Sequence, residues 1–143
     1  MRELEQAKCL LQKENFTCVL CKGEETYTSR QRGVKPLVSW LESDLNFCGC
    51  SAADKVVGKA TAFLYVLLGA KEVYAHTVSR PALEVLRQNR IGVEYGEAVP
   101  CIINRQGDGI CPFEEAVLGL YDPLLAYEAI RGKMKQMHLT LDP

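Results

Sequence analysis

The chain has 143 residues, of which 48% are hydrophobic and 24% are charged, and its formal net charge is -1. This length is typical of one domain with a substantial core, so we expect a single domain over residues 1–143. The nearly balanced charge gives no general attraction to nucleic acid or to an anionic membrane surface, and we expect neither as a partner.

The seven cysteines bear on the compartment in which the protein works. A secretory signal peptide combines a basic end with an apolar stretch, whereas this chain begins with the charged, amphipathic segment MRELEQAKCLLQKE. The odd number of cysteines also argues against a disulfide framework. We therefore expect a cytoplasmic protein with reduced thiols, several of them buried as small apolar side chains. The longest apolar run, residues 60–70, is well short of the roughly 20 residues that a membrane-spanning helix needs.

Two helices and a hairpin are predicted in the first third of the chain. Apolar side chains at helical spacing predict a helix over residues 2–14. Residues 16–21 are rich in strand-forming types and lead into the turn Lys22-Gly23-Glu24, so a hairpin is expected, with a return strand from Tyr27. The second helix is expected over residues 34–44, with Pro36 in its first turn.

The clearest element is a helix predicted over residues 52–68. Its apolar side chains form a wide stripe, and its second half is apolar nearly all round, which is typical of a central helix buried on several sides. Lys55 and Lys59 lie four residues apart on its narrow polar face. Residues Ser51 to Asp54 have the Ser-x-x-acid form of a capping box, which would place Asp54 in the first turn of this helix.

Strands and helices alternate in the second half of the chain. A strand is predicted over residues 72–78, then a helix introduced by Ser79-Arg80-Pro81, and one or two strands within residues 91–103. A polar loop over residues 104–110 precedes a helix that starts at Pro112. A last helix is capped by Asp122-Pro123 and runs to about residue 137. The alternation predicts a two-layer or three-layer α/β sandwich.

The candidate site combines the start of the long helix with the loop from Asn104 to Glu114. Asp54 would accept a hydrogen bond from a ligand, or it would only cap the helix. Lys55 and Lys59 would neutralise an anionic ligand in a cleft, or they would face solvent, because an unpaired buried charge is costly.

The loop itself follows an apolar strand and precedes a helix, which is where open α/β sheets bind ligands. Asn104 and Arg105 open this loop, and Arg105 could hold a phosphate or a carboxylate, although an ordinary glycine-containing turn also explains the pattern. Glu114 is a further candidate ligand-binding residue, although in the first turn of the next helix it also suits the helix dipole.

Two cysteine patterns are typical of functional sites. Cys111 precedes a helix and could act as a nucleophile with His76 as its base, or it could be a capping or buried thiol. The pairs Cys18-x-x-Cys21 and Cys48-Gly49-Cys50 suggest a four-thiolate zinc site. The odd spacing of Cys18 and Cys21 within a strand would turn their side chains to opposite faces, so we do not expect a metal site there. No cofactor is expected either.

Three segments together resemble a known family, namely SAADKVVGKA, HTVS and NRQGDGICPFEEAV. They are similar to an uncharacterised bacterial family of unknown function with a cytidine deaminase-like fold, and the similarity extends from Phe16 to the last helix. The resemblance implies a three-layer α/β/α sandwich with a central mixed sheet of about five strands. It also implies a homo-oligomer, since deaminase-like folds often associate.

The zinc motifs of true deaminases do not match this sequence. Those enzymes place a His or Cys ligand two residues before a general acid/base Glu, and two more ligands in a Pro-Cys-x-x-Cys turn. The first motif falls on Ala52-Ala53-Asp54 and the second on residues 79–83, and neither stretch holds a His or a Cys. Without those ligands no zinc hydroxide can be formed, so zinc-dependent deamination is not expected.

Three classes of function are compatible with these patterns. The first is a protein that binds a small anionic ligand, such as a nucleotide or a phosphorylated metabolite. The second is a metal-independent enzyme that uses Asp54 as a general base or Cys111 as a nucleophile. The third is an oligomeric interaction protein without catalysis.

Overall fold

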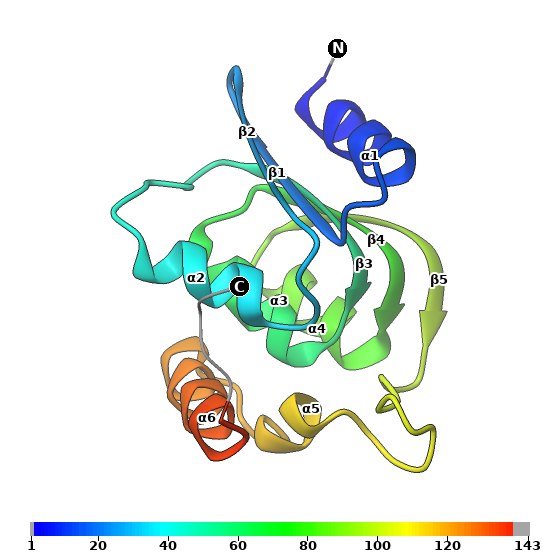
Figure 1. Ribbon diagram of the computed structural model, residues 1–143, viewed down its shortest axis with the longest axis vertical. Helices are drawn as coiled ribbons and strands as arrows, with labels where there is room; N and C mark the ends of the chain where they lie inside the picture. Colours follow the sequence, from blue (N-terminus) through cyan, green and yellow to red (C-terminus); the bar gives the residue numbers. More distant parts are fainter. Residues whose placement is uncertain (1, 139–143) are drawn as a thin grey trace.

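A computed structural model describes residues 2–138 as six helices and five strands (Figure 1). The helices are α1 (Glu3–Lys13), α2 (Lys35–Glu42), α3 (Lys59–Leu68), α4 (Arg80–Gln88), α5 (Pro112–Ala116) and α6 (Pro123–Gln136). The strands are β1 (Cys18–Lys22), β2 (Glu25–Ser29), β3 (Ser51–Val57), β4 (Glu72–Ser79) and β5 (Gly92–Val99). No helix among the described residues is both long enough and apolar enough to span a bilayer.

The strands form one mixed sheet in the order β2-β1-β3-β4-β5. β1 runs antiparallel to both of its neighbours, with Leu20 opposite Ala52, whereas β3, β4 and β5 are mutually parallel. The carboxyl ends of these three strands therefore lie at the same end of the sheet, and α3 and α4 begin there. In open α/β sheets the carboxyl ends of the strands are the usual place for a ligand.

Helices cover both faces of the sheet, which gives the expected α/β/α sandwich with a five-stranded mixed sheet (Figure 1). α1 packs on one face through Leu4, Ala7 and Leu11, against a cluster that includes Val19 and Tyr74. On the other face α2, α3 and α4 share the larger core, and α6 packs on the outside of α3. Cys18 belongs to the larger core and Cys21 to the α1 cluster, so their side chains do lie on opposite faces, as predicted.

The prediction of a helix over residues 52–68 is wrong in its first half, because residues 51–57 form the central strand β3. A strand covered on both faces has no polar side, so its apolar residues merged with those of the following helix into one run. Gly58 separates the two elements. The predicted capping box at Ser51 is therefore wrong, and Lys55 and Lys59 do not share a helix face.

The second half of the same prediction is confirmed, because α3 is buried over Ala60 to Tyr65 without interruption. Most of the remaining elements agree with their predicted ranges. β5 is a single strand, and Ile103 forms only an isolated bridge with Ile110 at the base of the loop. Asp122 caps α6 as predicted, since its side chain accepts a hydrogen bond from the Leu124 amide at 2.8 Å.

Candidate functional site

A cavity of about 560 Å³ lies at the carboxyl end of β3. It is bounded by the segment before β1, the connection from β2 to α2, the first turn of α3, and the chain that leads into α5. Asp54 is its most buried acidic group, and Val34, Ile102 and Phe113 contribute apolar wall. Four cationic side chains also line it, namely Arg30, Arg32, Lys55 and Arg105.

Asp54 lies in β3 with only 8% of its surface exposed. Its Oδ2 accepts a hydrogen bond from the Tyr65 hydroxyl at 2.7 Å, and its Oδ1 accepts a long one from the Val56 amide at 3.3 Å. The Tyr65 oxygen also lies 3.1 Å from Cys18 Sγ, and Cys18 is opposite Asp54 across the β1–β3 pair. These contacts place a connected polar group, Cys18, Tyr65 and Asp54, beneath the cavity.

Burial dominates the acid–base properties of this group. It raises the pKa of Asp54 to about 6, although the hydrogen bonds from Tyr65 and Val56 favour the ionised form. Burial, with the nearby Asp54 charge, raises the pKa of Tyr65 and of Cys18 well above their ordinary values. Asp54 is thus the member of the group that can change its protonation state near neutral pH.

Glu114, which is distant from α3 in sequence, accepts hydrogen bonds from the first backbone amides of that helix. Its carboxylate accepts hydrogen bonds from the amides of Lys59 at 2.7 Å and Ala60 at 2.9 Å. The first amides of a helix have no partner within the helix, and negative charge there is favourable. Burial raises the pKa of Glu114, and the two amide bonds oppose that rise. Gly58 leaves the necessary room, since a Cβ at that position would lie 2.5 Å from the Glu114 carboxyl group.

The cations around the cavity are held mainly by neutral groups. Lys55 Nζ donates a hydrogen bond to Asn15 Oδ1 at 2.9 Å, and the Arg30 guanidinium lies 4.4 Å from the centre of the Phe16 ring. Arg32 and Arg105 are exposed. Within residues 2–138 none of the four forms a salt bridge, so the cavity has an excess of positive charge at its walls.

Two of the residues expected at the site lie outside the cavity lining. Lys59 Nζ lies 4.9 Å from the centre of the Tyr121 ring. Asn104 organises its own loop, because its side-chain oxygen accepts hydrogen bonds from the Gly107 amide at 2.8 Å and the Asp108 amide at 3.2 Å. Both residues therefore have structural contacts that account for them without a ligand.

Cys111 lines the cavity, but His76 does not. The His76 ring is exposed on β4, with Nδ1 3.3 Å from the Thr77 hydroxyl. The described residues contain no group of three or more His, Cys, Asp or Glu side chains placed to hold a metal ion.

Sequence reasoning did not find Tyr65, Arg30 or Arg32. Tyr65 read as one more apolar residue of a buried helix, and no spacing connects the two arginines after β2 with Asp54. Gly58 was the one sequence feature that pointed to a close contact at the start of α3, because a glycine between a strand and a helix often permits a close approach to the backbone.

These features define an α/β protein with a buried acid at the base of a cationic cavity, at the carboxyl end of a parallel strand. The chain belongs to the DUF1893 family, since the family model described as TM1506, domain of unknown function (DUF1893), matches residues 6–134. The crystal structure of a DUF1893 family protein (TM1506) from Thermotoga maritima is similar, with a TM-score of 0.81 and 27% sequence identity. The match covers 94% of this chain and 89% of that one. A search of the curated proteins finds no significant match.

The first prediction concerns the contact between Gly58 and Glu114. We expect Gly58→Ala to lower the free energy of unfolding by about 1–3 kcal/mol, because the new methyl group would displace the Glu114 carboxylate. In a Glu114→Ala background the same substitution should cost much less, giving a coupling of about 1–3 kcal/mol in a double-mutant cycle measured by urea unfolding. Gly132→Ala is the control, since a Cβ there would meet no atom within 4 Å. Additive effects of the two substitutions would contradict the prediction.

The second prediction follows from the raised pKa of Asp54. Between its ordinary value of 3.8 and about 6, the folded protein keeps a proton that the unfolded chain has lost. The contribution of Asp54 to the free energy of unfolding therefore falls as pH rises through this window. The free energy of unfolding of Asp54→Asn should equal that of the wild type near pH 4 and should be larger by roughly 2–3 kcal/mol at pH 7.

Urea unfolding at both pH values measures this difference, with the exposed Asp44→Asn as the control. If wild type and Asp54→Asn differ in free energy of unfolding by the same amount at pH 4 and pH 7, the pKa of Asp54 is not raised in the folded protein and the prediction is wrong.

Proposed function

We propose that the cavity binds a small anionic ligand, such as a nucleotide or a phosphorylated metabolite. The observation that carries the proposal is the charge arrangement, in which four cations that form no salt bridge within residues 2–138 surround a cavity with a buried acid, Asp54, at its base. The anionic group of the ligand would lie against Arg30, Arg32, Lys55 and Arg105. A hydroxyl or amine at the other end would donate to Asp54.

The size and walls of the cavity support a ligand of this kind. A volume of about 560 Å³ is within the range of roughly 300–1,000 Å³ typical of small-molecule sites. Val34, Ile102 and Phe113 offer apolar surface to the body of the ligand. Arginine side chains are well suited to the anionic end, because their planar groups can form two parallel hydrogen bonds to a phosphate or a carboxylate.

Glu114 excludes one way of binding the anionic group, namely at the backbone amides that begin α3. Its carboxylate already occupies the amides at the start of α3, which would otherwise be the natural place for a phosphate. In the proposed complex Glu114 keeps this position, and the anionic group of the ligand contacts the side-chain cations.

We also propose that the fold is related to the cytidine deaminases. Support comes from the mixed sheet and from two successive helices, α3 and α4, that begin at the carboxyl ends of parallel strands. The zinc chemistry is not part of this proposal. With α3 beginning at Lys59, its first turn, Lys59 to Ala62, contains no His, Cys or acidic residue, and neither does the start of α4. Asp54 lies in a strand, so it has no counterpart in the deaminase helix motif.

A metal-independent reaction is the alternative function of the same site. Asp54 supports it better than Cys111 does, because a carboxyl group with a pKa of about 6 is suited to general base catalysis near neutral pH. Cys111 lacks the expected base, since His76 lies outside the cavity lining. We also propose that the protein works in the cytoplasm, because its seven cysteines are all free thiols, which suits a reducing compartment.

The third prediction tests ligand binding by a thermal-shift screen with nucleoside phosphates, sugar phosphates and inorganic phosphate, followed by calorimetry. A ligand at 100 times its dissociation constant adds about 2.7 kcal/mol to the free energy of unfolding, which corresponds to a shift of several degrees. Arg32→Ala and Arg105→Ala should each raise the dissociation constant about tenfold, because each removes a charge-assisted hydrogen bond.

Lys135→Ala is the matched control, because it removes an exposed cation from α6. The proposed function is wrong if no compound shifts the melting temperature, or if the shift is the same in both arginine variants and the control.

A second candidate function, assembly into a homo-oligomer, is favoured by an apolar surface around the start of α6. Four large side chains within eight residues are more than half exposed there, namely Leu118, Tyr121, Leu124 and Leu125. Such clusters commonly mark protein interfaces, and tyrosine is enriched in them. We propose that copies of the chain associate through this surface.

The fourth prediction is that Leu124→Glu converts the oligomer to a monomer, because it places a charge in the contact. Light scattering coupled to gel filtration, with all proteins at one concentration, measures the mass. Leu45→Glu is the control, since Leu45 is 51% exposed and lies outside this surface. A monomeric wild type, or an unchanged mass for Leu124→Glu, would exclude this interface.

A further inference from the structure

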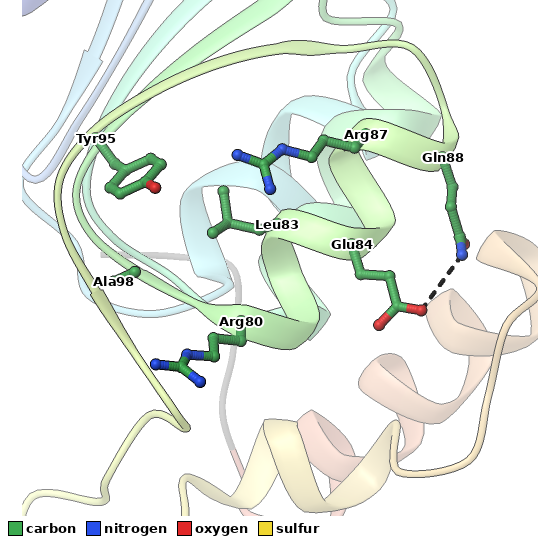
Figure 2. Close-up of a pocket in the computed structure, with 7 residues that line it drawn as sticks. All are labelled: Arg80, Leu83, Glu84, Arg87, Gln88, Tyr95 and Ala98. Carbon is green, nitrogen blue, oxygen red and sulfur yellow. Dashed lines mark hydrogen bonds between the residues drawn. The ribbon is translucent and has the colours of Figure 1, made fainter.

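A second concave region lies between α4 and the edge strand β5, and we call it the α4–β5 groove (Figure 2). Its volume is about 550 Å³, and Arg80, Leu83, Arg87, Tyr95 and Ala98 line the side between the helix and the strand. It shares no residue with the lining of the cavity around Asp54. Any ligand of the groove is therefore independent of the proposed function of that cavity.

The α4–β5 groove is cationic. Figure 2 shows that Arg80 and Arg87 extend from α4 toward β5, whereas Glu84 and Gln88 point to the other side of the helix. Glu84 also accepts a hydrogen bond from Gln88 at 3.4 Å. In the part of the chain that the structure describes, neither arginine forms a salt bridge. The lining of the groove therefore holds two arginines and one acid, Glu84, and because Glu84 is directed away from β5, the side that faces the strand is positively charged and favours an acidic occupant.

An apolar strip separates the two arginines. Leu83 forms its base and is 7% exposed, while Tyr95 on the strand side is 41% exposed. Arg80 and Arg87 are seven residues apart on a helix, which corresponds to about 10.5 Å along its axis. An occupant of the groove thus meets positive charge, apolar surface and positive charge in succession.

The edge of β5 is open beside this groove. β5 is the last strand of the sheet, and its outer edge pairs with no strand in residues 2–138. Most of its eight residues are exposed, and it contains no proline and no lysine, although it has two charged residues, Glu94 and Glu97. Glu97 accepts a hydrogen bond from the Thr77 hydroxyl at 2.9 Å. Glu94 is directed to the α1 side, where it forms salt bridges with Arg2 and Lys8. Unpaired main-chain groups of an edge strand can bind an added strand.

We propose that β5 and the α4–β5 groove bind an extended acidic peptide segment of a partner protein. The segment would pair with β5 as a sixth strand, and its acidic side chains would contact Arg80 and Arg87. Side chains on one face of a strand repeat every ~6.8 Å, so acids two or four residues apart bracket the arginine spacing. A second copy of the chain fits less well, because pairing two β5 strands would bring four arginines of like charge together.

The test uses an array of short peptides that carry two glutamates, separated by one, two or three residues, in a valine and threonine background. Lysine replaces glutamate in the matched control peptides. We expect peptides with one or three intervening residues to bind about tenfold more tightly than their lysine counterparts, measured by fluorescence anisotropy. Methylation of the peptide's backbone nitrogens should abolish binding, because it removes the donors that pair with β5.

The fifth prediction is that Arg80→Glu combined with Arg87→Glu weakens binding of these peptides about tenfold or more. Both residues are exposed, so the variant should unfold at the wild-type temperature, and Lys135→Glu serves as the charge-matched control. The proposal is overturned if no peptide of the array binds, or if the double variant binds as tightly as the control. It is equally overturned if inorganic phosphate or a nucleotide binds at Arg80 and Arg87 and the peptides do not, because the groove would then be a small-anion site.

Discussion

The carboxylate of Glu114, bonded to the amides of Lys59 and Ala60, joins distant parts of the chain at the candidate site. α3 begins in the interior, where its first amides need partners, and an unsatisfied buried amide is costly. Gly58 allows the carboxylate to approach the backbone closely. The chain before α5 is thereby held over the end of β3 and closes one side of the cavity. One wall of the candidate site therefore depends on this contact.

Asp54 is the second constraint, because it places an ionisable group in the central strand. Burial of a carboxylate is unfavourable, and the Tyr65 hydroxyl offsets only part of the cost, as the raised pKa indicates. A more stable strand would carry a neutral residue at this position. Functional sites tend to contain perturbed ionisable groups, which is why we propose a role in binding or catalysis for the acid at the base of this cationic cavity.

The three surfaces with a proposed role are built from different elements. The cavity lies at the carboxyl end of β3, the apolar surface lies around the start of α6, and the α4–β5 groove lies along the edge of the sheet. The cavity and the groove share no lining residue, and none of the four side chains of the apolar surface belongs to either lining. A member of the DUF1893 family can thus be tested for a ligand, for self-association and for a peptide partner by separate substitutions.

The sequence by itself determined the local elements whose signals are contained in a few neighbouring residues. The hairpin turn, the Asp122 cap and the burial of α3 were all predicted from such patterns, and so was the opposite orientation of Cys18 and Cys21. The tertiary structure alone decided that residues 51–57 are a strand, because β1 and β4 pair with them from both sides. It also decided that Glu114 caps α3 rather than its own helix, and that Tyr65 and two arginines after β2 surround Asp54. These contacts join residues far apart in the chain, and periodicity within a short window contains no information about them.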